Sequence, residues 1–328
     1  MTLPTAEIRN IAVFRALQLG DLICSMPAIS ALRKAYPEAK ISFIGLPGMK
    51  ELIGRYKACI DDFIAFPGYP GLPEQPYDPE GFAVFLRKMR NAQCDLVLQM
   101  QGNGSIVNEM IRSFGAKYTA GFCQDNREAS ALMLPYPNYG HEISRHLALM
   151  AHLGIEDTSA ADLTFPLFDA DFEGLKRQGL ALKPRSYICI HPGSRGSWRQ
   201  WPPLYFAMAA DVCAEKGYQV VITGTKNELE LANKVAALMK YAPIIASGKT
   251  DLGSVAALLS QARGLIANCT GVSHVAAALK VPSVVISMDG EPERWGPLNK
   301  ELHRTIDWTS SQDVSAVMQA VQAMCHKG

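Results

Sequence analysis

GLIANCTGVSHVAAALKVPSVVIS, residues 264–287, contains a strand, a helix and a second strand in succession. The apolar run at 264–268 predicts a buried strand, 273–280 predicts a helix, and 283–287 predicts another buried strand. Two strands joined through a helix pair in parallel within one sheet. Small polar residues separate the first strand from the helix, at the edge where such a sheet presents its ligand-binding groups. The stretch therefore predicts an α/β fold and marks a candidate binding site.

The same alternation of apolar strands and amphipathic helices occurs in both halves of the chain. Further strands are predicted at 11–16, 40–46, 61–66, 94–100, 187–191 and 218–224. Further helices are predicted at 27–37, 82–92, 105–115, 203–217, 227–240 and 314–327. Nearly continuous apolar strands between helices are typical of parallel sheets covered on both faces. We therefore expect two doubly wound α/β domains, one over 1–160 and one over 185–328. Residues 161–184 would form a linker with a short helix, and the C-terminal helix could pack back on the first domain.

Composition excludes several classes of protein. The 328 residues are 48% hydrophobic and carry a net charge of +1, which argues against disorder and gives no global case for nucleic-acid binding. The eight cysteines include no C-x-x-C pair, so no zinc or iron–sulfur site is expected, and reduced thiols suit a cytoplasmic location. The first residues show no signal-peptide pattern, and no run approaches roughly 18 apolar residues. A membrane-bound substrate could still be reached by peripheral contact with the inner face of a membrane.

The first half carries one candidate catalytic residue after its first strand. Gly20 and Asp21 follow that strand and precede a helix expected to start near Pro27, because proline suits a first helical turn. Asp21 would then lie at the carboxyl edge of the sheet, where it could act as a general base on a substrate hydroxyl. The alternative is an aspartate that only caps a turn after glycine.

Two loops of the second half carry candidate ligand-binding residues. Ser194, Arg195 and Arg199 lie in the loop after the strand 187–191, where small residues and guanidinium groups suit an anion. The alternative for this loop is a solvated segment anchored by its tryptophans. A different loop places Glu228 in the first turn of a helix, where it could accept hydrogen bonds from a ribose or simply favour the helix dipole.

The stretch quoted at the outset supplies a further candidate site. Thr270 and Gly271 precede or open a helix whose first turn contains His274, and free N–H groups at a helix N-terminus favour a diphosphate. Thr270 could equally be a plain N-cap, and a helix-terminal histidine is often a structural residue. The convergence of these loops on one sheet edge favours the ligand-binding interpretation.

Taken in order, four segments resemble glycosyltransferase family nine, the heptosyltransferase family of lipopolysaccharide core synthesis. They are RALQLGDLICSMPAISALRKAYPEAKISFI (15–44), CDLVLQMQGNGSI (94–106), HPGSRGSWRQWPPLYFAMAADVCAEKGYQVVITGTKNELELA (191–232) and NCTGVSHVAAALKVPSVVIS (268–287). They match the family's Leu-Gly-Asp loop, its Asp-x-Gln-Gly segment, its His-Pro-Gly and Lys-x-Trp-Pro stretch, and its Asn-Asp-Thr-Gly-x-x-His signature. The resemblance covers most of the chain.

The resemblance implies a GT-B fold, in which two Rossmann-like domains face a central cleft. It implies an inverting, metal-independent transferase that needs no cofactor and uses a nucleotide-diphosphate sugar, by family default ADP-heptose, with a lipid-linked or oligosaccharide acceptor. By motif match Asp21 would be the base, Arg199 would replace the family's lysine at the leaving group, and Cys269 stands where the family has aspartate. Thr270, Gly271 and His274 would hold phosphates, with Ser194 and Arg195 in the adjoining loop.

The acceptor would bind to the first domain. Candidates there are Gly20, Gln101, Arg87 and Lys88, although charged residues on a helix more often form a solvated face. Two rival functions remain open from the residues alone, because fold does not fix function. One is a nucleotide-sugar epimerase of the same architecture, which would convert the donor without an acceptor. The other is a non-catalytic nucleotide-sugar-binding protein, suggested by Cys269. The oligomeric state is not predicted.

Overall fold

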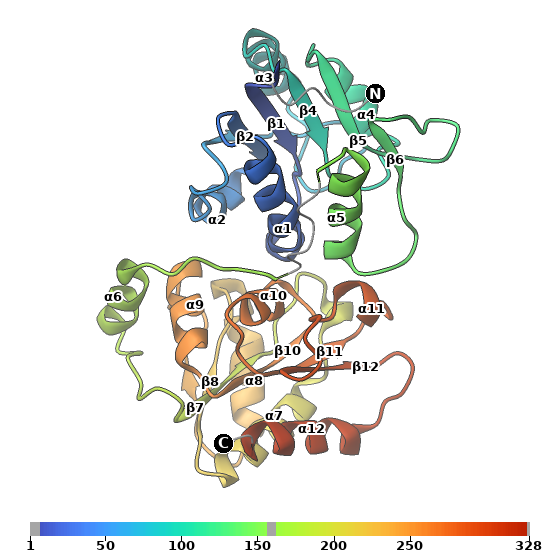
Figure 1. Cartoon of the computed structure of the whole chain (residues 1–328). Coiled ribbons are helices and arrows are strands. Elements are labelled where there is room, and N and C mark those ends of the chain that lie inside the picture. Colours follow the sequence, from blue (N-terminus) through green and yellow to red (C-terminus); the bar gives the residue numbers. More distant parts are fainter. Residues whose placement is uncertain (1–6, 156–161, 327–328) are drawn as a thin grey trace. The chain divides into compact units, whose positions relative to one another are not determined.

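A computed structural model of the chain describes residues 7–155 and 162–326. The chain divides into two compact units, Met1–Asp162 and Leu163–Gly328. Each unit is built on its own sheet (Figure 1). The predicted domain boundary at 160 lies outside the described residues.

The described part of the first unit contains a six-stranded parallel sheet in the order β3-β2-β1-β4-β5-β6. Its strands are β1 (Asn10–Phe14), β2 (Lys40–Gly45), β3 (Asp62–Ala65), β4 (Leu96–Gln99), β5 (Tyr118–Cys123) and β6 (Met133–Pro135). Its helices are α1 (Leu19–Ala35), α2 (Lys50–Gly54), α3 (Pro79–Asn91), α4 (Val107–Arg112) and α5 (Glu142–His152), with a 3-10 turn η2 (Pro47–Met49). Helices α3 and α4 supply apolar side chains to one core, and α1 packs against α5.

The second unit repeats this architecture, again with six parallel strands among the described residues, in the order β12-β11-β10-β7-β8-β9. Its strands are β7 (Tyr187–His191), β8 (Gln219–Ile222), β9 (Ile244–Ile245), β10 (Gly264–Asn268), β11 (Ser283–Ser287) and β12 (His303–Asp307). Its helices are α6 (Asp169–Arg177), α7 (Pro203–Glu215), α8 (Leu229–Leu238), α9 (Leu252–Gln261), α10 (Gly271–Ala278), α11 (Pro292–Trp295) and α12 (Val314–His326), with 3-10 turns η3 (Ser197–Arg199) and η4 (Lys226–Glu228).

Numbered within its own unit, each sheet has the order 3-2-1-4-5-6, which is that of a Rossmann fold. This confirms the predicted fold class of two doubly wound α/β units. The central strands β10 and β11 are buried along their whole length, because helices cover both faces of the sheet. The C-terminal helix α12 packs on α7 within the second unit, and α6, in the segment predicted as a linker, packs on α9.

The first helix differs from the prediction. It begins at Leu19 rather than near Pro27, so Asp21 lies in the first turn of α1 and not in a loop. Pro27 lies inside the helix, where it removes one backbone hydrogen bond. The prediction was wrong because buried apolar residues such as Leu22 and Ile23 pack the first two turns, and this packing offsets the proline. Over the described residues, no helix combines the length and the apolar character needed to cross a membrane.

Candidate active site

Both groups of candidate residues lie where the strand order of a sheet reverses. In the first unit the chain passes from β1 to β2 on one side, and β4 lies on the other side of β1. In the second unit β7 is flanked by β8 and β10 in the same way. The loops that leave the carboxyl ends of such a central strand pair diverge and form the usual ligand crevice of a doubly wound sheet. Each unit therefore presents its candidate residues at a topologically favoured position.

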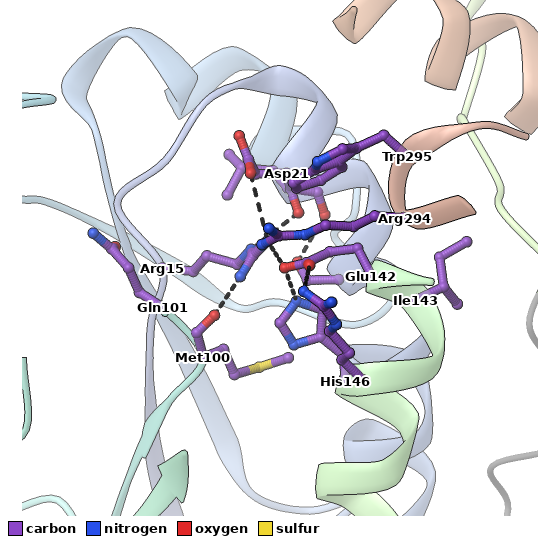
Figure 2. Close-up of polar contacts among 12 residues, drawn as sticks. Arg15, Asp21, Met100, Gln101, Glu142, Ile143, His146, Arg294 and Trp295 are labelled. Carbon is purple, nitrogen blue, oxygen red and sulfur yellow. Dashed lines mark hydrogen bonds and ion pairs between the residues drawn. The ribbon is translucent and has the colours of Figure 1, made fainter. Parts of the chain in front are cut away.

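Arg15 is the centre of the site in the first unit (Figure 2). It follows β1, is fully buried, and donates from Nε to the main-chain oxygen of Asp21 at 2.9 Å and from Nη1 to the oxygen of Met100. Its Nη2 lies 3.8 Å from Oδ1 of Asp21, an ion pair without hydrogen-bond geometry. A single guanidinium group therefore links the ends of β1 and β4 to the first turn of α1.

The same Nη2 of Arg15 also faces Glu142, the first residue of α5. Nη2 of Arg15 donates to Oε1 of Glu142 at 3.2 Å, across 127 residues of sequence. Oε2 of Glu142 accepts from Nη1 of Arg145 at 3.3 Å, and Nε2 of His146 lies 3.4 Å from Oε1. All of these side chains except that of Asp21 are at most 6% exposed. The result is a buried charge network that includes Asp21 at its rim.

Asp21 is the accessible member of the network, with 26% of its side chain exposed. Burial raises the pKa of Asp21, Arg15 opposes this effect, and Glu142 adds to it. A carboxylate with a raised pKa is a stronger base than an ordinary aspartate, provided that it stays ionised at the working pH. The arrangement suits proton abstraction from a hydroxyl group.

His146 gives this unit a defined pH dependence of stability. Burial lowers the pKa of His146 to about 4, while an unfolded histidine titrates near about 6.5. Between these two values the unfolded chain binds more protons than the folded chain, so the free energy of unfolding falls as the pH is lowered. We expect a loss of roughly 3 kcal/mol across this window from His146 alone. Hydrogen exchange of the α5 amides between pH 4 and 7 would measure it. His146→Gln should flatten the dependence, and an unchanged slope in that variant would contradict the assignment.

The acceptor-side candidates divide between the two edges of the first sheet. Gly20 is buried in the first turn of α1, and Gln101 follows β4, where its Oε1 accepts from the N–H of Ala16 at 2.7 Å. Both therefore lie beside the Asp21 network, and Gln101 fixes the loop after β1. Arg87 and Lys88 are exposed near the end of α3, which runs back to the start of β4. The structure places these two at the opposite edge of the sheet, away from Asp21.

In the second unit Arg199 lies in η3, after β7, and is 39% exposed. Its Nη2 pairs with Oδ2 of Asp289 at 3.2 Å, and its guanidinium carbon lies 4.7 Å from the ring centre of Trp198. Asp289 follows β11 and accepts a hydrogen bond from Ser287 at 2.9 Å. The carboxylate and the ring thus hold a partly exposed cation at the carboxyl edge of the sheet. A guanidinium held in this way suits a phosphate group.

Asn268 fastens the arginine-bearing loop to the sheet. Its Oδ1 accepts from the N–H of Trp201 at 2.9 Å, and its Nδ2 donates to the oxygens of Pro192 at 2.8 Å and Gly193 at 3.3 Å. Trp201 is fully buried, whereas Trp198 is 64% exposed. Of the two tryptophans, only Trp201 therefore anchors the loop to the core, whereas the alternative interpretation of this loop used both.

The N-terminus of α10 lies beside this loop, because β10 pairs with β7. Ser273 Oγ donates to the oxygen of Thr270 at 2.7 Å and accepts from its N–H at 3.3 Å. Among the described residues, the buried Oγ1 of Thr270 has no hydrogen-bond partner. Gly271 opens the helix, and His274 is 4% exposed with its ring 6.3 Å from that of Trp295. An unpaired hydroxyl at a helix N-terminus suits an anionic ligand.

The remaining candidates differ in their surroundings. Burial, with the Asp289 carboxylate nearby, raises the pKa of Cys269 to about 12, so its thiol stays protonated. Glu228 Oε2 accepts from the N–H and Oγ1 of Thr225 at 2.7 and 2.9 Å. Its carboxylate fills the space that a side chain at Gly193 would need. Ser194 is buried and Arg195 is exposed in the same loop. The site residues that the sequence analysis missed are Arg15, Glu142, Asn268 and Asp289.

The residues that the structure describes include no group of three or more His, Cys, Asp or Glu side chains arranged to hold a metal ion. The site in the first unit is a buried Arg–Glu network beside one partly exposed carboxylate. The second unit adds an anchored arginine and an open helix N-terminus.

Comparisons with known proteins show which family the chain is similar to. The model of glycosyltransferase family 9 (heptosyltransferase) matches residues 83–320. Lipopolysaccharide heptosyltransferase 3 of Escherichia coli (strain K12) is 24% identical over 295 residues, which cover 86% of this chain and 83% of that protein. The crystal structure of a family 9 glycosyl transferase from Veillonella parvula has a TM-score of 0.82 at 22% identity and covers 100% of this chain and 99% of its own. Escherichia coli ADP-heptose lps heptosyltransferase II has a TM-score of 0.75 at 19% identity, with 97% and 98% covered.

These structural likenesses confirm the predicted GT-B fold class over essentially the whole chain. The family model spans most of the chain and includes every candidate residue of the second unit. The chain belongs to glycosyltransferase family 9, the heptosyltransferases, and is a glycosyltransferase.

Proposed function

We propose that this enzyme transfers heptose from ADP-heptose to a lipopolysaccharide-core acceptor with inversion at the anomeric carbon. One relative is named a lipopolysaccharide heptosyltransferase, and the name of one structural neighbour specifies ADP-heptose. The observation that carries the proposal is the position of Asp21, an accessible carboxylate beside a buried guanidinium at the switch point of the first sheet. The proposal places the enzyme in the cytoplasm, with peripheral contact at the inner face of the membrane where a lipid-linked acceptor is anchored.

In the proposed reaction Asp21 accepts the proton of an acceptor hydroxyl. The hydroxyl oxygen then attacks the anomeric carbon of the donor, and the bond from that carbon to the diphosphate oxygen breaks. Negative charge grows on the departing ADP. Arg199, the N–H groups at the start of α10 and the hydroxyl of Thr270 would stabilise that charge, which is the electrostatic part of the barrier. The hydrogen bonds made by Asn268 keep the loop that carries Arg199 in place. The proposed scheme uses no metal ion.

The roles of three further residues are narrower. Cys269 contributes a neutral thiol, which adds no charge next to the diphosphate. Glu228 would hold the loop at Gly193 through its packing, because its Oε2 already accepts two hydrogen bonds from Thr225. Ser194 and Arg195 would border the phosphates, with Arg195 reaching from an exposed position.

Nucleotide titration tests the donor half of the proposal. We expect calorimetry to show that ADP binds more tightly than UDP, GDP or CDP. His274→Ala should weaken ADP binding by roughly tenfold, the cost of one hydrogen bond to a charged group. His152→Ala, at the end of α5 in the first unit, is the control and should bind ADP as the parent does. Equal affinity for all four nucleotides, or no binding, would overturn the ADP assignment.

A transfer assay tests the acceptor half. ADP-heptose and a heptose-deficient lipopolysaccharide core should give one product that is heavier by a single heptosyl residue, detected by mass spectrometry. Family membership favours a transferase over the epimerase considered above. Incubation with ADP-heptose alone separates the two, because an epimerase converts the donor when no acceptor is present. Conversion of the donor alone, or binding without any turnover, would overturn the proposed reaction.

A further inference from the structure

The buried network beside Asp21 contains several charged side chains, whereas a single counter-ion would be enough to stabilise an ionised aspartate. Arg15 contacts the main chain of Asp21, the oxygen of Met100 and the carboxylate of Glu142 (Figure 2). These partners come from α1, from the loop after β4 and from α5. If Arg15 served only as the counter-ion of Asp21, it would not need to be held by three different elements.

We propose that Arg15 and Glu142 are positioning residues, which hold Asp21 in place and set the pH range in which it works as the base. The inference rests on the proposed function, in which Asp21 is that base. Neither Arg15 nor Glu142 is assigned to contact a substrate, since their side chains are 1% and 3% exposed.

Position is the first part of the argument. The bond from Nε of Arg15 to the main-chain oxygen of Asp21 fixes the backbone of the base rather than its side chain. Glu142 in turn holds Nη2 of the guanidinium, and Arg145 donates to Glu142 from the next turn of α5. The carboxylate of Asp21 is 26% exposed, so a hydroxyl group can reach it. Displacement of a reacting group by about 1 Å can cost on the order of a hundredfold in rate.

Charge balance is the second part. The charged groups facing Asp21 are Arg15 from the end of β1 and Glu142 from α5, while Arg145 and His146 face Glu142. His146 stays neutral above about pH 4, because burial lowers its pKa to about 4. The two arginines are then balanced by Glu142 and an ionised Asp21. Uncompensated buried charge is costly, so this balance favours the ionised form of Asp21, against the effect of its own burial.

The two charges act on Asp21 with opposite signs, which makes the inference testable. Arg15 lowers the pKa of Asp21, and Glu142 raises it by a smaller effect. A purely structural ion pair that only fastens α5 to β1 would affect stability when either partner is removed. It would not move the activity profile in opposite directions for the two partners. The sign of the shift therefore separates positioning of the base from simple scaffolding.

The experiment is the pH profile of kcat/KM for the full chain, with ADP-heptose and the core acceptor, in Glu142→Gln, Arg15→Gln and Arg15→Lys. Glu142→Gln should move the acidic limb to lower pH, and Arg15→Gln should move it to higher pH. Arg15→Gln should also lower kcat at least tenfold with little change in either KM, because the base is misplaced. Arg15→Lys keeps the charge and should return the limb to its original position. Asp95→Asn is the control: this carboxylate caps the start of β1 at the opposite sheet edge and should leave the profile unchanged.

Limbs that move in the same direction in the two glutamine variants, or that do not move, would overturn the inference, as would Arg15→Lys behaving like Arg15→Gln. If a single variant does not fold, Arg15→Gln combined with Glu142→Gln removes one charge of each sign and leaves Arg145 and Asp21 to balance each other. The limb of this double variant should then move to higher pH, because the effect of Arg15 is the larger, and an unmoved limb refutes the inference. Asp21→Asn, measured alongside, separates this inference from the proposed function. If Asp21→Asn retains turnover, Asp21 is not the base and the proposed function fails. If Asp21→Asn loses turnover but the acidic limb does not move in the Arg15 and Glu142 variants, only the positioning role of Arg15 and Glu142 is refuted.

Discussion

Replacement of Asp21 by asparagine is expected to lower kcat by about a thousandfold, within the range of roughly 10²–10⁴ that general-base catalysis contributes. Asparagine matches aspartate in shape but cannot accept the proton of the acceptor hydroxyl. The bond from Arg15 to the main-chain oxygen of residue 21 does not involve the side chain, so the start of α1 should stay in place. Steady-state kinetics with ADP-heptose and the core acceptor would measure the loss.

The affinity for ADP provides the internal control for this variant. The candidate nucleotide-binding residues belong to the second unit, whereas Asp21 belongs to the first. We therefore expect Asp21→Asn to bind ADP with unchanged affinity in calorimetry. A kcat within about threefold of the parent value would mean that another group is the base. A protein that only binds nucleotide-sugars would show no turnover before or after the substitution.

The sequence predicted three buried strands of the second unit with the bounds that the structure shows. The predicted ranges 187–191, 264–268 and 283–287 coincide with β7, β10 and β11. Each is a short apolar run with clear boundaries, and all but the last residue of β7 are buried, so composition alone defines the strand. Strand β5, helix α5 and helix α9 are among the elements that were not predicted. Their sequences mix small and polar residues, and their burial depends on which neighbours the fold supplies.

The site residues also divide into those that the local sequence reveals and those that depend on distant parts of the chain. Asp21, Arg199, Thr270 and His274 were identified because each lies at a strand-to-helix transition that the local sequence reveals. Glu142 could not be identified, since its significance comes from Arg15, which is 127 residues away in the chain. One local signal for Arg15 was available: an arginine inside the apolar run VFRAL must be paired when it is buried. Asp289 gave no comparable signal, because nothing in MDGEPE distinguishes a surface loop from the partner of Arg199.

Removal of the Arg199 guanidinium should produce the second large effect. We expect Arg199→Gln to lower kcat by about 10²–10³-fold, the typical cost of one preorganised group that stabilises charge in the transition state. The expected loss is large because Arg199 is already held in place in the ligand-free chain, by Asp289 at 3.2 Å and by the ring of Trp198. Little reorganisation is then needed when negative charge develops on the departing ADP.

Arg199→Lys separates charge from geometry at this position. Lysine keeps the positive charge but loses the planar fork and the stacking on Trp198, so we expect a kcat between those of the parent and Arg199→Gln. Arg304→Gln, an exposed arginine on β12, serves as the matched control and should leave kcat unchanged. If the glutamine variant raises the KM for ADP-heptose while kcat stays constant, Arg199 binds the donor equally in the ground state and the transition state. The stabilisation of the leaving group would then have to come from the N-terminus of α10 and the unpaired hydroxyl of Thr270.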